Sequence, residues 1–500
     1  MARYAVSLQV GLTMLAVLLL LLLQGLLILL ALSDAQLGGG AAAAVGVDNY
    51  WAMVRSFEFR RALANTLWVL AMALVIIVPA LGVVMRLGEQ SRRLRVLVLV
   101  AVIVPLAMPG ALGALAWRST LEVLHIPLDR RWVALPVFAL VQAWRAFPLA
   151  VAVRTAPLRQ HQRTRAGLAG AVAAYWIVAD VSVVMLLTGG TPANATHVLA
   201  SWGYVTAVTG GQIGLGAAME MTLLVVLRLL GIALGWLGVQ LLLQRADGVT
   251  PPAPASADLA ASRPAWRAWT ALTVLLLWLL TPLLVVVVQA GWPWAWGEPL
   301  RVLTTTSGYV WWLGGTLLLA AGAVLVTVWA APPAAQWLVR RSLNMRKAAG
   351  SGVLALVLTS LPVAFVPLLW VDDRLRLVPA LGELALLYIF AALCLGVGFA
   401  ALAQARLQLD RRGLIAALAL IALFVITQEF SNALALDVGR AQTLNSGLVN
   451  HLAFRADIAP ATTALAVLLP TLLFGALFGS LVWVIHKRRA RGTEIPFGEE

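Results

Sequence analysis

Long apolar runs alternate along the whole chain with short segments that contain Arg, Gly and Pro. An apolar run of about 20 residues is long enough to cross the hydrocarbon core of a bilayer as an α-helix. The pattern therefore predicts twelve membrane helices, at residues 8–32, 62–86, 96–117, 132–153, 166–188, 213–243, 267–290, 309–339, 349–371, 380–404, 413–435 and 460–486. The run at 8–32 exceeds the core of about 7–15 residues of a secretory signal, so we interpret it as a retained first helix.

The composition leads to the same fold class. Hydrophobic residues make up 62% of the 500 residues and charged residues only 11%, whereas a soluble domain carries roughly 25% charged residues. Too few charges are present to solvate a surface of this size, so most of it must face lipid. The sequence predicts an all-α polytopic membrane protein with the lipid bilayer as its first partner.

The basic residues are distributed unevenly between the predicted loops. With the N-terminus placed inside, the inner loops contain about twice as many Arg and Lys residues as the outer loops. This asymmetry predicts that both termini lie in the cytoplasm, and we expect a prokaryotic inner membrane. The formal net charge of +15 is explained by these loops and by anionic lipid headgroups, and no nucleic-acid-binding module is visible, so no nucleic-acid partner is predicted.

One segment resembles an interdomain linker. Residues 246–264, ADGVTPPAPASADLAASRP, are rich in Pro and Ala and separate six predicted helices from six. The halves, 1–245 and 265–500, have the same order of features: a lone helix, an aromatic outer cluster, a long helix and an Arg-rich inner loop. Because six is an even number of crossings, two such units have the same orientation in the membrane. The sequence predicts two fused copies of one fold.

Polar residues inside the predicted helices are candidates for function, because a charge at a helix centre costs about 2.5–3.5 kcal/mol. Two interpretations remain open: the residues line a translocation path, or they pair across helices and hold the bundle together, as Arg145 could with Asp180. Arg228 lies two turns from Glu220 on the same helix, too far for direct contact. The path candidates are Gln142, Trp144, Arg145, Asp180, Glu220, Gln428, Glu429 and Asn432.

No catalytic or metal motif is visible in the chain. Cys394 is the only cysteine, and the five His residues are scattered singly without metal-ligand spacing. No phosphate-binding G-x-x-x-x-G-K-[ST] motif occurs, so any ATPase must be a separate protein. We predict no enzyme activity, no metal site and no cofactor.

The stretch LTGGTPANATHVLASWGYVTAV, residues 187–208, interrupts the apolar pattern with a turn-rich polar segment. With the GGQIGLGAAMEM that follows, it resembles the membrane subunits of binding-protein-dependent sugar ABC importers of the maltose/glycerol-phosphate type. That family has a TGGGP-x-x-x-T loop, a Tyr-containing helix and a Gly-Ala-Ala entry to its last helix. The matching residues are Thr188, Gly189, Gly190, Pro192, Asn194, Thr196, Tyr204, Gly214, Gly216, Ala217 and Ala218.

Two further stretches resemble the same family. NYWAMVRSFEFRRALANTLWVL is similar to its entry to the core, with Asn65 and Thr66 at an Asn-Thr pair. ITQEFSNALALDVGRAQTLNSGLVNHL is similar to a stretch of the partner subunit. Its matching residues are Glu429, Phe430, Leu434, Thr443, Leu444, Gly447 and Leu448.

The resemblance implies a helical translocation subunit that meets an external solute-binding protein through the outer loop and separate ATPase subunits inside. In the family, an EAA motif in the inner loop after the fourth helix of each half forms a coupling helix on the ATPase. Neither loop here, RTAPLRQHQRTRAGLAGA nor AQARLQLDRRGL, contains Glu-Ala-Ala. The residual ATPase-facing positions are Pro157, Arg159, Arg163, Gly170, Arg406 and Arg411.

These features give three expectations for function. The first is a permease that imports a sugar or similar small polar solute. The second is a degenerate permease that no longer transports and acts as a membrane scaffold or regulatory subunit, as the missing EAA motifs suggest. The third is an ion- or proton-coupled transporter, for which Asp180, Glu220 and Glu429 are the available carboxylates.

Overall fold

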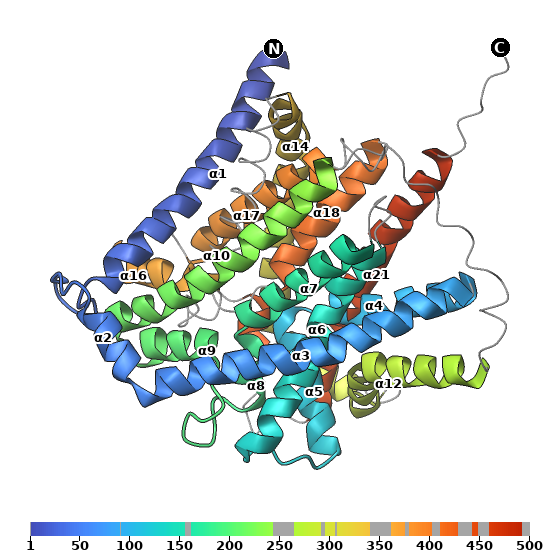
Figure 1. Cartoon of the computed structure of the whole chain (residues 1–500), viewed down its shortest axis with the longest axis horizontal. Coiled ribbons are helices and arrows are strands. Elements are labelled where there is room, and N and C mark those ends of the chain that lie inside the picture. The colour runs from blue at the N-terminus through green and yellow to red at the C-terminus, as the bar shows by residue number, and fades with distance from the viewer. Residues whose placement is uncertain are drawn as a thin grey trace.

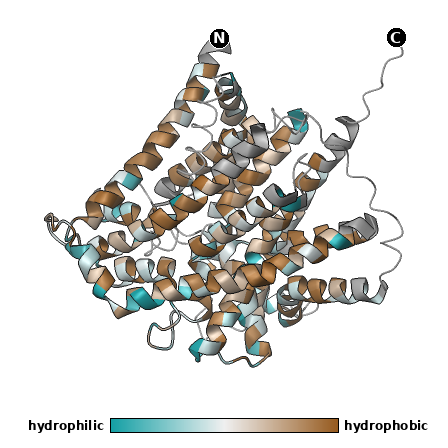
Figure 2. Ribbon diagram, viewed as in Figure 1, coloured by the Kyte–Doolittle hydropathy of each residue, from teal (hydrophilic) through white to brown (hydrophobic). Residues whose placement is uncertain are grey.

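The structure is a computed structural model that contains helices and, among the residues it describes, no strand beyond one isolated bridge. It describes residues 2–90, 92–155, 162–243, 265–291, 296–305, 308–340, 362–375, 380–402, 411–428, 443–448 and 460–492. Within these ranges, eight helices are long and apolar enough to cross a membrane, and two shorter apolar helices accompany them. Hydrophobic residues predominate along these helices (Figure 2), and many of their large apolar side chains are exposed. The prediction of an all-α polytopic membrane protein is confirmed.

The first half is built from long helices joined by short ones (Figure 1). Long helices α3, α6, α7 and α10 pack on one another, and α1 lies against α10. The bounds are α1 Ala2–Ala31, α2 Asp48–Arg55, α3 Phe57–Gln90, α4 Arg92–Ala107, α5 Gly110–Val123, α6 Arg131–Thr155, α7 Gln162–Ala179, α8 Ser182–Leu187, α9 Leu199–Tyr204, the π-helical turn η1 Val205–Thr209, and α10 Ile213–Leu243.

The second half repeats this packing. Helices α14, α17, α18 and α21 pack on one another as α3, α6, α7 and α10 do, and α12 lies against α21 as α1 lies against α10. The bounds are α12 Ala265–Gln289, α13 Gly297–Thr305, α14 Tyr309–Val339, α16 Phe365–Leu375, α17 Ala380–Leu402, α18 Arg411–Gln428, α20 Leu444–Leu448 and α21 Pro460–Gly492.

The halves exchange contacts through several helices. Helix α1 packs against α14 and α17, and α4 packs against α12 and α21. Helix α5 of the first half packs against α12 and α21 of the second, and α16 of the second half packs against α1 and α10 of the first. Tyr204 and Phe365 are in ring contact at this second interface, with centroids 5.4 Å apart. The exchange buries apolar faces of each half against the other, so the halves form one body.

A hydrogen-bond pattern also occurs twice. In the first half, the Thr66 hydroxyl of α3 accepts the Leu199 N–H at 2.8 Å, and the Ser201 hydroxyl accepts the Val198 N–H at 3.0 Å. In the second half, Thr316 of α14 accepts the Leu444 N–H at 2.8 Å, and Ser446 accepts the Thr443 N–H at 3.1 Å. In both places a long helix binds the start of a short helix through one threonine. This caps donors that the short helix cannot satisfy itself.

Replacing Thr66 or Thr316 by Val is expected to cost about 1–3 kcal/mol each, because a buried backbone N–H loses its acceptor. The matched control is Thr120→Val. Thr120 is equally buried, but its hydroxyl only donates to the Ala116 carbonyl of its own helix. Thermal unfolding in detergent compares the three variants. An effect of Thr120→Val as large as the other two would contradict the role assigned to Thr66 and Thr316.

Two predicted membrane helices are wrong as single spans. The predicted 96–117 helix is divided into α4 and α5, because Pro109 takes an extended conformation and α5 starts after it. The predicted 166–188 helix is divided into α7 and α8 after Ala179. Here the Asp180 carboxylate accepts the backbone N–H of Ser182 at 3.1 Å and competes with the helical hydrogen bonds.

Several predictions fall outside the described residues. They concern the linker 246–264, the start of the 349–371 span and the end of the 413–435 span. Five candidate site residues also lie outside the described residues: Pro157, Arg159, Arg406, Glu429 and Asn432.

Candidate functional site

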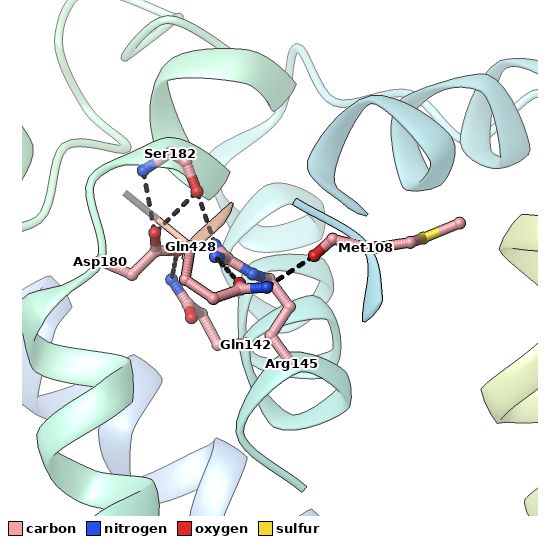
Figure 3. A network of polar contacts seen from close by, with 6 residues as sticks. All are labelled: Met108, Gln142, Arg145, Asp180, Ser182 and Gln428. Carbon is pink, nitrogen blue, oxygen red and sulfur yellow. Dashed lines mark hydrogen bonds and ion pairs between the residues drawn. The ribbon is translucent and has the colours of Figure 1, made fainter. Parts of the chain in front are cut away.

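The polar candidates that the structure brings together lie where α7 gives way to α8 (Figure 3). Asp180 lies in this break and Ser182 starts α8. Gln142 and Arg145 come from α6, and Gln428 from the last position of α18 in the other half. We call these five residues the polar junction.

An ion pair lies at the centre of the polar junction. Arg145 Nη1 is 2.6 Å from Asp180 Oδ2, and the two side chains are only 4% and 9% exposed. Nη1 also donates to the Ser182 hydroxyl at 2.5 Å, which in turn donates to Asp180 Oδ1 at 2.6 Å. The predicted pairing of Arg145 with Asp180 is confirmed. Each charge is balanced at close range, which a buried charge requires.

Gln142 donates a further hydrogen bond to the Asp180 carboxylate and has one unpaired acceptor atom. Its Nε2 donates to Asp180 Oδ2 at 2.7 Å, which fixes the orientation of the amide. The other amide atom, Oε1, is buried and has no hydrogen-bond partner. Gln142 also lines a small cavity with Thr66, Phe138 and Val198, among others. An acceptor beside a cavity can bind a hydroxyl group or a water molecule.

Gln428 connects the junction to the other interrupted helix. Its Nε2 donates to the Met108 carbonyl at 2.7 Å and to the Leu106 carbonyl at 3.3 Å, at the break between α4 and α5. Its Oε1 lies 3.5 Å from Arg145 Nη2. A Cβ at Gly110 would lie 2.8 Å from the Gln428 carbonyl oxygen, so only glycine allows this approach. The ends of α4 and α7 in the first half and of α18 in the second half therefore lie together at the polar junction.

The remaining described path candidates lie elsewhere. Trp144 is fully buried, donates to the Leu279 carbonyl of α12 at 3.1 Å and packs edge-on against Trp117. It joins the halves rather than the polar junction. Glu220 is on α10 and makes no hydrogen bond. Arg228 is bonded to Gln24 of α1, in agreement with the expectation that it does not contact Glu220.

The loop at 188–196 has an exposed tip and a buried base. Residues 191–194 are exposed, whereas Gly190 and Thr196 are buried. The Thr188 and Thr196 hydroxyls bond across the base at 2.9 Å. Positive φ angles turn the chain at Gly189, Gly190, Ala193 and Asn194, and Pro192 follows a cis bond.

Asn65 holds this loop onto α3. Its Nδ2 donates to the carbonyls of Ala195 at 3.0 Å and His197 at 2.8 Å, and its Oδ1 accepts a hydrogen bond from Arg131 at 2.7 Å. Thr66, the next residue, binds Leu199. The Asn-Thr pair and the turn-rich loop are far apart in the sequence, but in the structure they are direct partners.

His197 gives this anchor a pH dependence. Burial, with a smaller contribution from the positive charge of Arg61, lowers the pKa of His197 from 6.5 to about 4. The folded state thus binds the proton less readily than the unfolded state. Stability should be complete above pH about 6.5 and fall by about 2–4 kcal/mol as the pH drops towards 4.

Thermal unfolding between pH 4 and 7 measures this loss. The H197Q variant is expected to lose much of the pH dependence. Replacing the exposed His125 by Gln is the control and should leave the profile unchanged. Identical profiles for H197Q and wild type would contradict a neutral, buried His197.

The predicted ATPase-facing positions are only partly described. Arg163 lies near the start of α7, Gly170 is half-buried on the same helix, and Arg411 is exposed at the start of α18. Helix α6 ends at Thr155 and α7 begins at Gln162, so six residues lie between them. Eight residues lie between Leu402 of α17 and Arg411 of α18.

Sequence reasoning missed Ser182, Gly110 and the Leu106 and Met108 carbonyls. Asp180 was an available signal for Ser182, because an Asp carboxylate at a helix start accepts backbone N–H groups of the first turn. The Leu106 and Met108 carbonyls are backbone groups, so no residue type in the sequence marks them as hydrogen-bond acceptors. Among the described residues, no three His, Cys, Asp or Glu side chains come together as possible metal ligands.

No protein-family model matches the chain, and no curated protein matches it. The resemblance to sugar importer subunits therefore stays a prediction, and the case for a function depends on the geometry described above.

Proposed function

We propose that this protein is the translocation subunit of an importer, with two permease units fused in one chain. It would receive a sugar or similar small polar solute from an external binding protein, driven by separate ATPase subunits. One observation carries the proposal: the Asn65-Thr66 pair and the loop at 188–196, which separately resemble importer subunits, bind each other directly. A chance resemblance at two distant sites gives no reason for them to meet.

The duplication supports the same proposal. The threonine-to-short-helix bond occurs once in each half, and the four long helices of each half pack in the same order. Parallel repeats of this kind place binding sites at the interface between repeats, where helices are discontinuous. The polar junction has this position, since it joins two helix breaks and residues of both halves.

The polar junction suits a hydroxyl-rich solute. Gln142 has a free acceptor, and Gln428 and Arg145 carry amide and guanidinium donors. The Arg145 and Gln428 donors already bond to protein groups, so the proposed path would be closed in this conformation. A solute that enters would exchange these internal bonds for its own hydroxyl groups.

The inner loops favour a second candidate, a non-transporting scaffold or regulatory subunit. Six residues between α6 and α7 amount to fewer than two helical turns, and eight residues between α17 and α18 to little more. Neither connection contains the Glu-Ala-Ala of the family's coupling helix. If an ATPase binds, the starts of α7 and α18 are the described parts of the chain beside these connections.

The two candidates differ in their partners. The tagged full-length chain, extracted from its native membrane in mild detergent, is purified and the copurifying proteins are identified. The importer proposal expects an ATPase and a solute-binding protein in stoichiometric amounts. Recovery of a different membrane assembly without either would instead support the scaffold.

A photo-crosslinker placed at Arg411 should then reach the ATPase, and one at the exposed loop residue Asn194 the solute-binding protein. Arg301, an exposed residue of α13 in the second half, is the control position. Equal yields from all three positions would contradict specific contacts at Arg411 and Asn194.

A further inference from the structure

Glu220 is a buried acid without a partner. It lies in the first third of α10, its exposed fraction is 0%, and neither carboxyl oxygen has a hydrogen-bond partner. Two other ionisable groups within the bundle, Asp180 and the half-buried Arg228, differ in this respect. Asp180 has Arg145, Gln142 and Ser182 as partners, and Arg228 has Gln24.

The carboxyl group fits against a glycine of the facing helix. A Cβ on Gly203 of α9 would overlap Glu220 Oε1 and lie 3.1 Å from its Cδ. The space occupied by the carboxyl group therefore exists because residue 203 has no side chain. Directly after α9, the π-helical turn η1 also packs against α10, and π-helical turns are frequent at functional sites.

No charge balances Glu220 from the neighbouring elements. The elements packed on α10 are α1, α2, α7, α9, η1 and α16. None of their described charged or titratable groups forms a hydrogen bond or ion pair with Glu220. These groups, with that of α10 itself, are Asp48, Tyr50, Arg55, Arg165, Tyr175, Tyr204, Arg228, Asp372, Asp373 and Arg374.

We infer that Glu220 is a proton-binding site in the membrane interior, occupied when α9 packs against α10. An ionised carboxylate with no donor in an apolar site is strongly unfavourable, whereas the neutral acid can be buried at a much smaller cost. Release of the proton breaks the carboxyl O–H bond and transfers H⁺ to water, so water must reach the group. That requires α9 to move away from α10.

Helix α9 connects this site to the rest of the protein. Its first residue, Leu199, is bound by Thr66 of α3, and the loop at 188–196 precedes it. Deprotonation of Glu220 would therefore loosen α9, the helix that directly follows this loop. The inference goes beyond the proposed function, because a proton site here would serve a scaffold as well as a transporter.

Infrared spectroscopy of the full-length protein in lipid nanodiscs tests proton occupancy directly. The difference spectrum of wild type minus E220Q should show a protonated carboxyl C=O band at neutral pH. Raising the pH should remove this band and lower the thermal midpoint of the wild type by several degrees, while E220Q stays level. The control is Glu122→Gln, an exposed acid that should contribute only carboxylate bands.

A second experiment does not depend on E220Q. Gly203→Ala alone should lower the thermal midpoint, and E220A in the same chain should recover most of that loss, because the carboxyl group no longer occupies the space. Carboxylate bands alone from Glu220 at neutral pH would overturn the inference. So would a loss from Gly203→Ala that is unchanged in the E220A background.

Discussion

Replacing Arg145 by Met is expected to destabilise the protein by about 3–5 kcal/mol, the largest effect we predict for a single substitution. Methionine fills a similar volume but leaves the Asp180 carboxylate buried without its cation. Gln142 and Ser182 still donate to the carboxylate, but neither neutralises it. Denaturation of purified R145M in detergent, followed by intrinsic Trp fluorescence, measures the loss.

The control is Arg118→Met. Arg118 also pairs with an acid, Glu122, at 3.0 Å, but the side chains are 29% and 62% exposed. A surface pair of this kind is worth at most about 1 kcal/mol. Adding D180N to R145M should restore part of the stability, since the amide carries no charge and keeps an acceptor for Ser182. An R145M variant as stable as R118M would contradict the importance of the buried pair.

Gly190→Ala is expected to have the next largest effect, about 2–5 kcal/mol. Gly190 has φ of +91°, a conformation that alanine adopts at a cost of about 1–2 kcal/mol, and a Cβ there would overlap the imidazole ring of His197. Displacing a buried ring from a well-packed site adds about 1–3 kcal/mol. The loop base would open, and the thermal midpoint measures the effect.

The neighbouring Gly189 separates the two contributions. Its φ is +60°, but its Cβ would meet nothing closer than the Met185 carbonyl oxygen at 4.0 Å. Gly189→Ala should therefore show only the conformational cost, about 1–2 kcal/mol. Equal losses of stability for the two variants would mean that the His197 ring moves aside at no cost. That result would contradict the tight packing of Gly190 against His197.

The long helices could be predicted because their signal is local. A window of apolar residues shows that a segment lies in lipid, whatever its neighbours are. The breaks at Pro109 and Asp180 escaped prediction because the hydropathy of both runs continues across them. At Asp180 the local bond to Ser182 is joined by contacts from Arg145 and Gln142 of another helix, which a hydropathy window does not register.

The candidate site was predictable in part for the same reason. A charge in an apolar run is visible from the sequence, and this identified Arg145, Asp180 and Glu220. The sequence suggested that the first two could pair, which the structure confirms, but not that the third has no hydrogen-bond partner. Trp144 illustrates the limit, because a tryptophan beside Arg145 on one helix projects in a different direction and packs against α12.

Two features bear differently on the proposed function. The Asn65 anchor, the loop that it holds and the repeated threonine bonds would form the scaffold of the proposed permease. The connections after α6 and α17, which lack Glu-Ala-Ala, would concern its coupling to an ATPase. A protein could retain the first without the second, so the polar junction itself must be tested for access to water.

Accessibility of a cysteine at position 142 tests the central claim, that the polar junction lies on a translocation path. Q142C is introduced into the full-length chain, and a small water-soluble thiol reagent is added to native membranes with and without ATP. The native Cys394 is buried and serves as the internal control. A path predicts that Q142C reacts faster than Cys394, and that ATP changes its rate. Reaction no faster than that of Cys394 in both conditions would show that the polar junction is closed to water and would contradict the claim.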